Sequence, residues 1–354
     1  MTFDNLNSDH VDGSGVLVHD YGPHIFHTDD GPAYGFLSRF ASWNGYRHAV
    51  LADVPDGDGR KLVPVPFDLS SLEEAFGPEE GARLAAKLAA AHPGRASVPV
   101  SELASDPDPD VAGVGRYVYE HIFRHYTAKQ WGTDPATVDP SVTARVPVRL
   151  DRAGGYFRDA YQGLPVGGYA AMFGRMLRHP GIAVETGTDA LSRLALSDGA
   201  TYFDGGRFDG IVVYTGQVDR LFRYAHGELP YRSLEFRFRA YDEDYVLPCG
   251  TVNYTMDRDM TRATEFKRLT GQILPGRTVI CEEYPKDYAA GSGGVPCSPV
   301  KGGHSDAMYG KYAAEAARYR NLYLLGRLAR YSYLDMDDAV MAAMALAERV
   351  LGRA

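Results

Sequence analysis

The sequence has little of what marks a secreted, membrane or metal-binding chain. It carries three cysteines in 354 residues, and no apolar run approaches the length of a membrane span. Cys249, Cys281 and Cys297 lie far apart without metal-ligand spacing, so we expect reduced thiols. The first twelve residues are polar and acidic, unlike a secretory signal. These absences predict a cytoplasmic protein that does not associate with a membrane.

The sequence also has fewer basic than acidic residues. The chain has 37 Lys and Arg against 46 Asp and Glu, a formal net charge of −9. Phosphate backbones require basic surface, so no nucleic-acid partner is expected. A small anionic ligand remains compatible with this charge, because a few arginines can gather in one cleft.

Hydrophobic spacing predicts an α/β fold with a helical insert and an antiparallel sheet. Apolar residues recur at helical spacing over 69–91, 111–126 and 336–350. Short buried strands are expected at 14–18, 181–186, 211–216 and 321–326. Partial alternation predicts antiparallel strands at 229–245, 250–254 and 278–284.

Several long motifs resemble, in the same order, those of the UDP-galactopyranose mutase family, whose members interconvert six- and five-membered ring forms of a nucleotide sugar. The motifs are Val18 to Thr28 (VHDYGPHIFHT), Tyr126 to Gly132 (YTAKQWG), Arg145 to Arg149 (RVPVR), Tyr161 to Tyr169 (YQGLPVGGY) and Tyr333 to Asp337 (YLDMD). The resemblance covers nearly the whole chain from Asn5 onward. It implies an isomerase with a nucleotide-sugar substrate, and it leaves a homodimer open.

The resemblance also implies three domains. An α/β nucleotide-type domain would comprise residues 1–35, 176–228 and 318–354. A helical domain would comprise residues 66–146. The antiparallel sheet domain would comprise residues 36–65, 147–175 and 229–317.

One departure from the family concerns the cofactor. Family members open with a strand, a G-x-G-x-x-G turn, a helix and a second strand, a Rossmann βαβ unit that holds FAD. Gly57-Asp58-Gly59 has neither a preceding buried strand nor a following helix, so we expect the fold to lack this unit and to bind no FAD. The chain then resembles a flavin-lacking branch of antibiotic pathways, typified by GDP-L-galactose mutase.

That branch implies a flavin-independent mutase that uses Mg²⁺ or Mn²⁺ and a GDP-sugar such as GDP-L-galactose or GDP-L-fucose. Two alternatives stay open. One is an FAD-dependent UDP-galactopyranose mutase with a misannotated start, and the other is a non-catalytic nucleotide-sugar-binding relic.

The catalytic candidates follow from the resemblance. Arg149 and Arg262 match the family's two diphosphate arginines, since a guanidinium fork suits phosphate oxygens. Arg145 stands beside the first of them. His27 and Asp335 are candidates for the group that removes a proton. Most arginines in any chain are solvated surface residues, and only the motif context favours function here.

Further candidates line the expected substrate site. Tyr126 matches the residue that stacks on the nucleobase, Trp131 one that lines the sugar pocket, and Phe123 part of the base wall. Asn253, Arg327 and Tyr333 complete the substrate-binding set, although an aromatic residue in a helix usually belongs to a core.

The metal candidates are His24, His27 and Asp335. Two histidines at this spacing are a weak metal signal, and they could instead line a cavity or cap a turn. Asp337 is expected to be the N-cap of the last helix.

Overall fold

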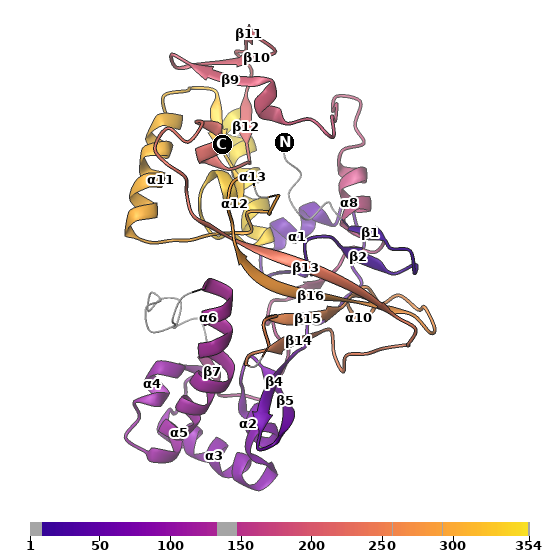
Figure 1. Cartoon of the computed structure of the whole chain (residues 1–354), viewed down its shortest axis with the longest axis vertical. Helices are drawn as coiled ribbons and strands as arrows, with labels where there is room; N and C mark the ends of the chain where they lie inside the picture. The colour runs from indigo at the N-terminus through magenta and orange to yellow at the C-terminus, as the bar shows by residue number, and fades with distance from the viewer. Residues whose placement is uncertain (1–8, 133–146, 257, 292, 353–354) are drawn as a thin grey trace.

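The computed structural model describes residues 9–132, 147–256, 258–291 and 293–352. Three regions follow one another along the long axis of the molecule, with helices at one end, a sheet in the middle and an α/β region at the other end (Figure 1). No helix in the described part of the chain is long and apolar enough to cross a membrane.

The helical region confirms the predicted helices and divides them. Its elements are α2 (Leu69–Phe76), α3 (Pro78–Ala91), α4 (Val100–Ala104), α5 (Pro109–Val118), the π-helix η2 (Tyr119–Arg124) and α6 (His125–Trp131). Asp68 caps α2 by accepting hydrogen bonds from the Ser70 and Ser71 amides, and Gly77 (φ 87°) breaks the expected long helix. A side chain at Gly115 would come within 2.3 Å of Ala104 N, so glycine allows α5 to pack on α4.

The middle region is a seven-stranded sheet. Its strands are β4 (Val50–Asp56), β5 (Gly59–Val65), β13 (Tyr231–Tyr241), β14 (Thr251–Tyr254), β15 (Arg262–Glu265), β16 (Thr278–Asp287) and β17 (Ser298–Pro299). Their order is β17-β13-β16-β15-β14-β4-β5. The pairing is antiparallel as predicted except between β14 and β4, which run parallel, so the sheet is mixed.

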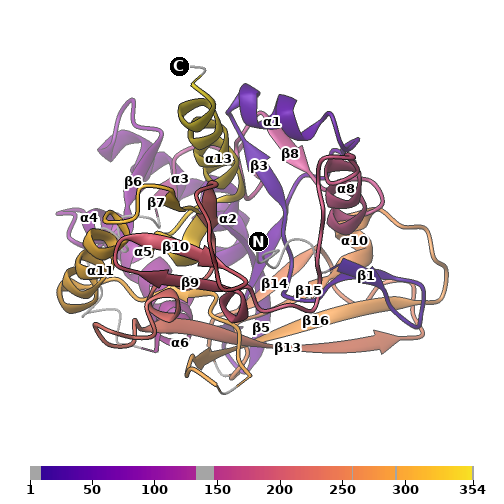
Figure 2. The same ribbon diagram turned by 90° about the horizontal axis from the view of Figure 1, so that it is seen from above.

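The α/β region contains a parallel strand pair, β12 (Val212–Tyr214) and β18 (Leu322–Leu324), which confirms two predicted strands. The strands β9 (Leu194–Ser197), β10 (Ala200–Phe203) and β11 (Gly206–Arg207) form a small antiparallel sheet nearby (Figure 2). The helices are α8 (Tyr169–Met176), α9 (Val218–Leu221), α11 (Gly303–Ala316), α12 (Gly326–Ala329), α13 (Met336–Leu351) and the 3-10 turn η4 (Ala190–Ser192).

One predicted strand is wrong. Residues 181–186 form no strand, and Ile182 and Val184 are each 45% exposed. The apolar run has no neighbouring strand to pair with among the described residues. Hydrophobicity alone was therefore not enough to form a strand.

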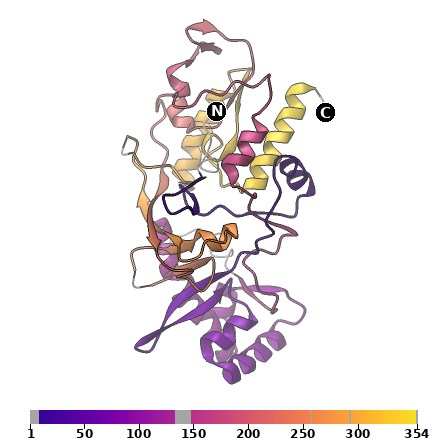
Figure 3. The same ribbon diagram turned by 90° about the vertical axis from the view of Figure 1, so that its right-hand side faces the viewer.

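Shorter elements join the regions. They are β1 (Asp9–Val11), β2 (Leu17–His19), β3 (Phe26–Thr28), β6 (Ser97–Pro99), β7 (Pro147–Arg149), β8 (Tyr161–Gly163), α1 (Gly31–Leu37) and α10 (Phe266–Thr270). The strand expected at 14–18 is β2, which pairs with β1. Helix α1 packs beside α13 through an apolar cluster that includes Leu37, Met336 and Val340 (Figure 3).

Candidate active site

Two cavities meet where the helical region, the sheet and the α/β region come together. The first, of 560 Å³, lies against η2 and α6, and we call it the helix-side cavity. The second, of 430 Å³, is lined by His24, His27 and His48, and we call it the histidine cavity. They share part of their walls, including Tyr126, Tyr156, Asn253, Arg262, Cys297 and Tyr333. The two cavities therefore form one site with two compartments.

The loop between β2 and β3 fixes His24 in the histidine cavity. His19 Nδ1 accepts a hydrogen bond from the His24 amide (3.1 Å), and His24 Nδ1 donates to the Gly22 carbonyl (2.9 Å). Gly22 has φ 83°, and a side chain there would meet Phe236 at 2.7 Å. Because Nδ1 donates, the neutral imidazole presents Nε2 as an acceptor. Burial, with lesser contributions from the Arg262 and Arg327 charges, lowers the pKa of His24 to about 4.

Arg262 is the cation common to both compartments. Its Nε donates to Glu283 Oε1 (2.6 Å), and Glu283 is 1% exposed. Burial alone lowers the pKa of Arg262, but the Glu283 carboxylate outweighs it and the pKa is raised. The side chain remains 31% exposed because it faces the cavities. This placement suits the predicted role at a diphosphate.

Arg149 lines the helix-side cavity, but its terminal nitrogens are already used. NH1 donates to the Gly155 carbonyl (2.8 Å) and NH2 to the Tyr156 carbonyl (2.9 Å). Burial, assisted by the nearby Arg158, lowers its pKa. Arg149 thus holds the cavity wall as well as adding charge to it. Arg145, predicted beside it, lies outside the described residues.

The predicted aromatic residues gather on the helix side. Tyr126 lines both compartments, and Phe123, 6% exposed, lines the helix-side cavity, as does Asn253. Burial raises the pKa of Tyr126, so its hydroxyl stays protonated. Trp131 ends α6, and its side chain is outside the described part of the structure.

Other residues of the Tyr126 to Gly132 motif hold the helix in place. Lys129 Nζ donates to the Arg258 carbonyl (2.9 Å) and also bonds the Tyr254 carbonyl at the end of β14. Arg232 of β13 donates to the Gln130 carbonyl (3.1 Å). The motif therefore serves docking of α6 on the sheet as well as the cavity wall.

Arg327, Tyr333 and Asp335 also line the histidine cavity. The Arg327 guanidinium lies over the Tyr333 ring (4.4 Å) and donates to the Cys297 and Leu334 carbonyls. Asp335, not Asp337, is the N-cap of α13, which corrects the sequence expectation. Asp337 instead accepts a hydrogen bond from Thr28 Oγ1 (2.6 Å) and so ties α13 to β3.

Two wall residues were missed by sequence reasoning. His48, 6% exposed, lines the histidine cavity, and Tyr46 contacts its Nδ1 (3.2 Å). Burial, with smaller effects from Arg262 and His27, lowers the pKa of His48 to about 3. Tyr156 lines both compartments, and burial raises its pKa. Neither lies in the motifs that carried the prediction.

His27, predicted as a base or metal ligand, stacks on Phe157 (3.6 Å between ring centroids) and lies 3.3 Å from Asp159. Within the described ranges, no three His, Cys, Asp or Glu side chains gather so as to hold a metal ion. His24, His27 and Asp335 share the cavity without forming such a group.

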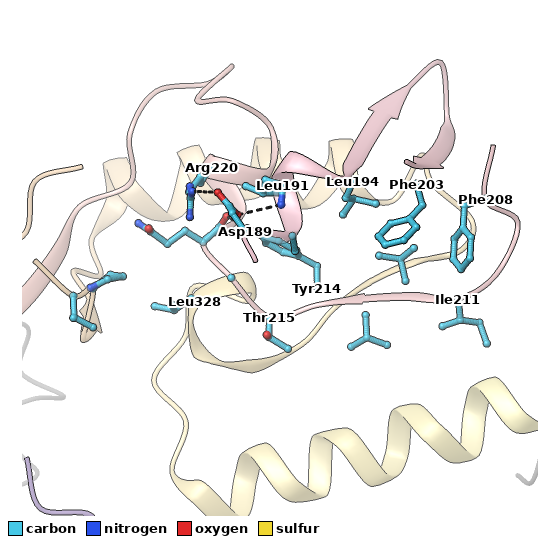
Figure 4. Close-up of a pocket in the computed structure, with 17 residues that line it drawn as sticks. Asp189, Leu191, Leu194, Phe203, Phe208, Ile211, Tyr214, Thr215, Arg220 and Leu328 are labelled. Carbon is cyan, nitrogen blue, oxygen red and sulfur yellow. Dashed lines mark hydrogen bonds and ion pairs between the residues drawn. The ribbon is translucent and has the colours of Figure 1, made fainter. Parts of the chain in front are cut away.

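A third cavity, of 480 Å³, lies between β12 and the small sheet β9–β11 (Figure 4). Its walls are largely apolar, with Leu194, Phe203 and Ile211 among them. Asp189 and Arg220 form an ion pair at one side (2.5 Å). This cavity brings together no set of groups suited to the sugar chemistry expected from the sequence.

Comparison with known proteins decides the family. The family model described as UDP-galactopyranose mutase matches residues 121–333, more than half of the chain. The UDP-galactopyranose mutase of Mycoplasma genitalium is 31% identical over 345 residues, covering 95% of this chain and 83% of that protein. The chain belongs to the UDP-galactopyranose mutase family. Enzymes of this family are isomerases, so the predicted enzyme class is confirmed.

Two further comparisons concern another curated relative and a solved structure. The dTDP-fucopyranose mutase of Escherichia coli is 29% identical over 97% of this chain and 88% of its own length. A crystal structure of reduced UDP-galactopyranose mutase aligns with a TM-score of 0.68 at 16% identity, covering 99% of this chain and 88% of that one. The mixed α/β fold of the family is thereby confirmed.

The expected flavin-lacking, metal-dependent branch is contradicted. The relatives are named as UDP- and dTDP-sugar mutases, and the aligned crystal structure is of a reduced UDP-galactopyranose mutase. The predictions of no FAD, of a required Mg²⁺ or Mn²⁺ ion and of GDP-L-galactose specificity are therefore wrong. They rested mainly on the expected lack of the whole glycine-rich βαβ unit, and the homology of the remaining chain outweighs that signal.

The histidine cavity is the compartment bordered by the α/β region, through Arg327, Asp335 and Met336. It lies beyond the carboxyl end of β18, where parallel α/β sheets bind their ligands, and within the size range of about 300–1,000 Å³ of small-molecule sites. The turns that follow β12 and β18 carry one glycine each, Gly216 and Gly326, so neither is a G-x-G-x-x-G turn. That the fold lacks a complete Rossmann βαβ unit stays a prediction.

Proposed function

We propose that this chain interconverts the pyranose and furanose forms of a nucleotide sugar with a reduced flavin in the histidine cavity. The observation that carries the proposal is the position of Arg262, which lines both compartments together with Tyr126 and Asn253, whereas His24 lines the histidine cavity. The nucleotide would occupy the helix-side cavity and the sugar would lie at the boundary.

In this arrangement Arg262 binds the diphosphate and stabilises the negative charge that develops when the nucleotide leaves the anomeric carbon. Arg149 adds positive charge to the wall of the helix-side cavity. Tyr126 offers a ring on which a base can stack, which any base can use. Its protonated hydroxyl adds no negative charge beside the diphosphate.

The histidines shape the other compartment. His24 and His48 are neutral near pH 7, so they can exchange hydrogen bonds with sugar hydroxyls without competing for the diphosphate. A bound reduced flavin supplies the nucleophile for the anomeric carbon. His27 and Asp335 stay candidates for moving a proton at the ring oxygen.

The reaction can be followed directly. Purified protein, reduced with dithionite, would be incubated with UDP-galactofuranose or a dTDP-linked furanose, and the pyranose product separated by ion-exchange chromatography. We expect conversion of at least one of these substrates. If the protein binds the nucleotides but converts neither sugar, it is a binding protein and the proposal fails.

A further inference from the structure

Arg262 is held by a buried carboxylate on the neighbouring strand. Arg262 of β15 and Glu283 of β16 are direct cross-strand partners, and Glu283 Oε1 accepts from Arg262 Nε at 2.6 Å. Glu283 is itself fixed, because its backbone carbonyl accepts from both the amide (2.8 Å) and the hydroxyl (3.2 Å) of Thr261. The pair thus belongs to the middle of the sheet and not to a flexible loop.

This contact uses one edge of the guanidinium. The terminal NH1 and NH2 groups of Arg262 have no hydrogen-bond partner among residues 9–132, 147–256, 258–291 and 293–352. An arginine side chain has several rotatable bonds, and a bond at Nε fixes the direction of the remaining fork. Diphosphate oxygens are recognised by such a fork when it is held in one orientation.

We propose that Glu283 is a positioning residue that aims Arg262 at the diphosphate of the nucleotide sugar, an inference that rests on the proposed function. Two effects of this carboxylate oppose each other. Its charge weakens the attraction between Arg262 and an anion, whereas its hydrogen bond orders the guanidinium. Positioning requires that the second effect exceeds the first.

Two conservative variants separate these effects. Glu283→Gln keeps an oxygen that can accept from Nε but removes the charge. Glu283→Asp keeps the charge but withdraws the carboxylate by one methylene, which breaks the 2.6 Å contact. Binding of UDP and of uridine to both variants would be measured by calorimetry. We expect Glu283→Asp to weaken UDP binding about tenfold, with uridine binding unchanged, and Glu283→Gln to stay within about threefold of wild type.

Glu265→Asp is the matched control. Glu265 is fully buried, pairs with Arg268 (3.0 Å) and accepts from the Val246 and Leu247 amides. Unlike Arg262, the partner Arg268 lines neither compartment. Its variant should lower the melting temperature and leave the ratio of UDP to uridine affinity unchanged. In steady-state kinetics, Glu283→Asp should raise the KM for the nucleotide sugar, in line with its weaker binding of UDP.

Several results would overturn the inference. One is UDP binding by Glu283→Asp at wild-type affinity, and another is a parallel loss of UDP and uridine binding, which indicates a structural role only. Stronger UDP binding by Glu283→Gln together with wild-type behaviour of Glu283→Asp would show that the charge dominates. Where the wild type binds dTDP rather than UDP, the same comparison is made with dTDP and thymidine, and failure of the wild type to bind either nucleotide would overturn the inference too. A wild type that binds UDP without turnover refutes the proposed function alone, since the UDP-to-uridine ratio still decides the role of Glu283.

Discussion

Arg262 concentrates the positive charge of an acidic protein at the centre of its site. It is close enough to His24, His48 and Tyr126 to affect the pKa of each of them. In the proposed function a single guanidinium in this position serves both compartments, because the leaving diphosphate and the sugar would meet there. Its removal should therefore affect the chemistry more than the fold.

We expect Arg262→Ala to reduce mutase turnover by about 10- to 100-fold, the effect of losing one charge-assisted contact to a buried phosphate. Arg262→Lys should recover little, because an ammonium group lacks the planar fork. Activity would be measured on protein shown to be folded by circular dichroism. Arg95→Ala, which breaks a surface ion pair with Glu102, is the control and should be fully active. Wild-type turnover of Arg262→Ala would refute the assignment.

His48 should make stability depend on pH. Its pKa is about 3 in the folded protein, whereas an unfolded histidine titrates near pH 6.5. Between these values the unfolded chain binds the additional proton, so the free energy of unfolding falls as the pH drops from about 6.5 toward 3. In His48→Gln this fall should be shallower by up to about 1.4 kcal/mol per pH unit.

The measurement is urea unfolding at a series of pH values between 4 and 7. His10→Gln provides a comparison at the surface, because the His10 side chain is 55% exposed whereas His48 is buried. An unchanged slope in His48→Gln would show that the ring is already charged or accessible to water in the folded state.

Helix α13 shows how one residue can serve packing and chemistry together. Asp335 caps the helix, and its amide donates to Asp338 Oδ2 (3.1 Å), while its position also lines the histidine cavity. The cap explains the aspartate without any catalytic role, and only a substitution that preserves the cap can separate the two.

Asp335→Asn is that substitution, because asparagine caps helices about as well as aspartate. We expect the melting temperature to stay near that of the wild type and turnover to fall at least about tenfold, as for loss of a proton-transferring group. Asp335→Ala should lose roughly 1 kcal/mol of stability in addition. If Asp335→Asn is fully active, Asp335 is a cap and no more.

The π-helix η2 affects the same site through helix geometry. Its six residues join α5 to α6 in one continuous helical stretch, and Phe123 lies within it. A π-turn adds a residue to one turn of the helix and so changes which side chains face the cavity afterwards. Helical spacing predicted the helix at 111–126 but could not show this local change.

The three regions meet at one site, so a bound cofactor can be tested only on the whole folded protein. We expect purified protein to show flavin absorbance between about 350 and 500 nm, or to gain it on incubation with FAD, and to require a reductant for turnover. Excess EDTA should leave turnover unchanged. A colourless protein that fails to take up FAD, or activity lost to EDTA and restored by Mg²⁺, would contradict this.

The motifs located the site well in some places and misled in others. Arg262, Tyr126, Phe123, Asn253, Arg327 and Tyr333 were all expected around one ligand, and they line the two adjoining cavities. Their roles stay predictions. The prediction that the protein binds no FAD was wrong. It gave the apparent lack of the glycine-rich βαβ unit more weight than the homology along the rest of the chain.

The amino-acid sequence was enough to establish the family and most helices and strands, because motif order and hydrophobic spacing are local properties of the chain. It could not establish that Glu283, 21 residues beyond Arg262, is its partner, since that pairing depends on the register of β15 on β16. It also could not place His48 in the cavity or assign the cap of α13. Such contacts arise only when segments distant in sequence pack together and bury their polar groups against one another.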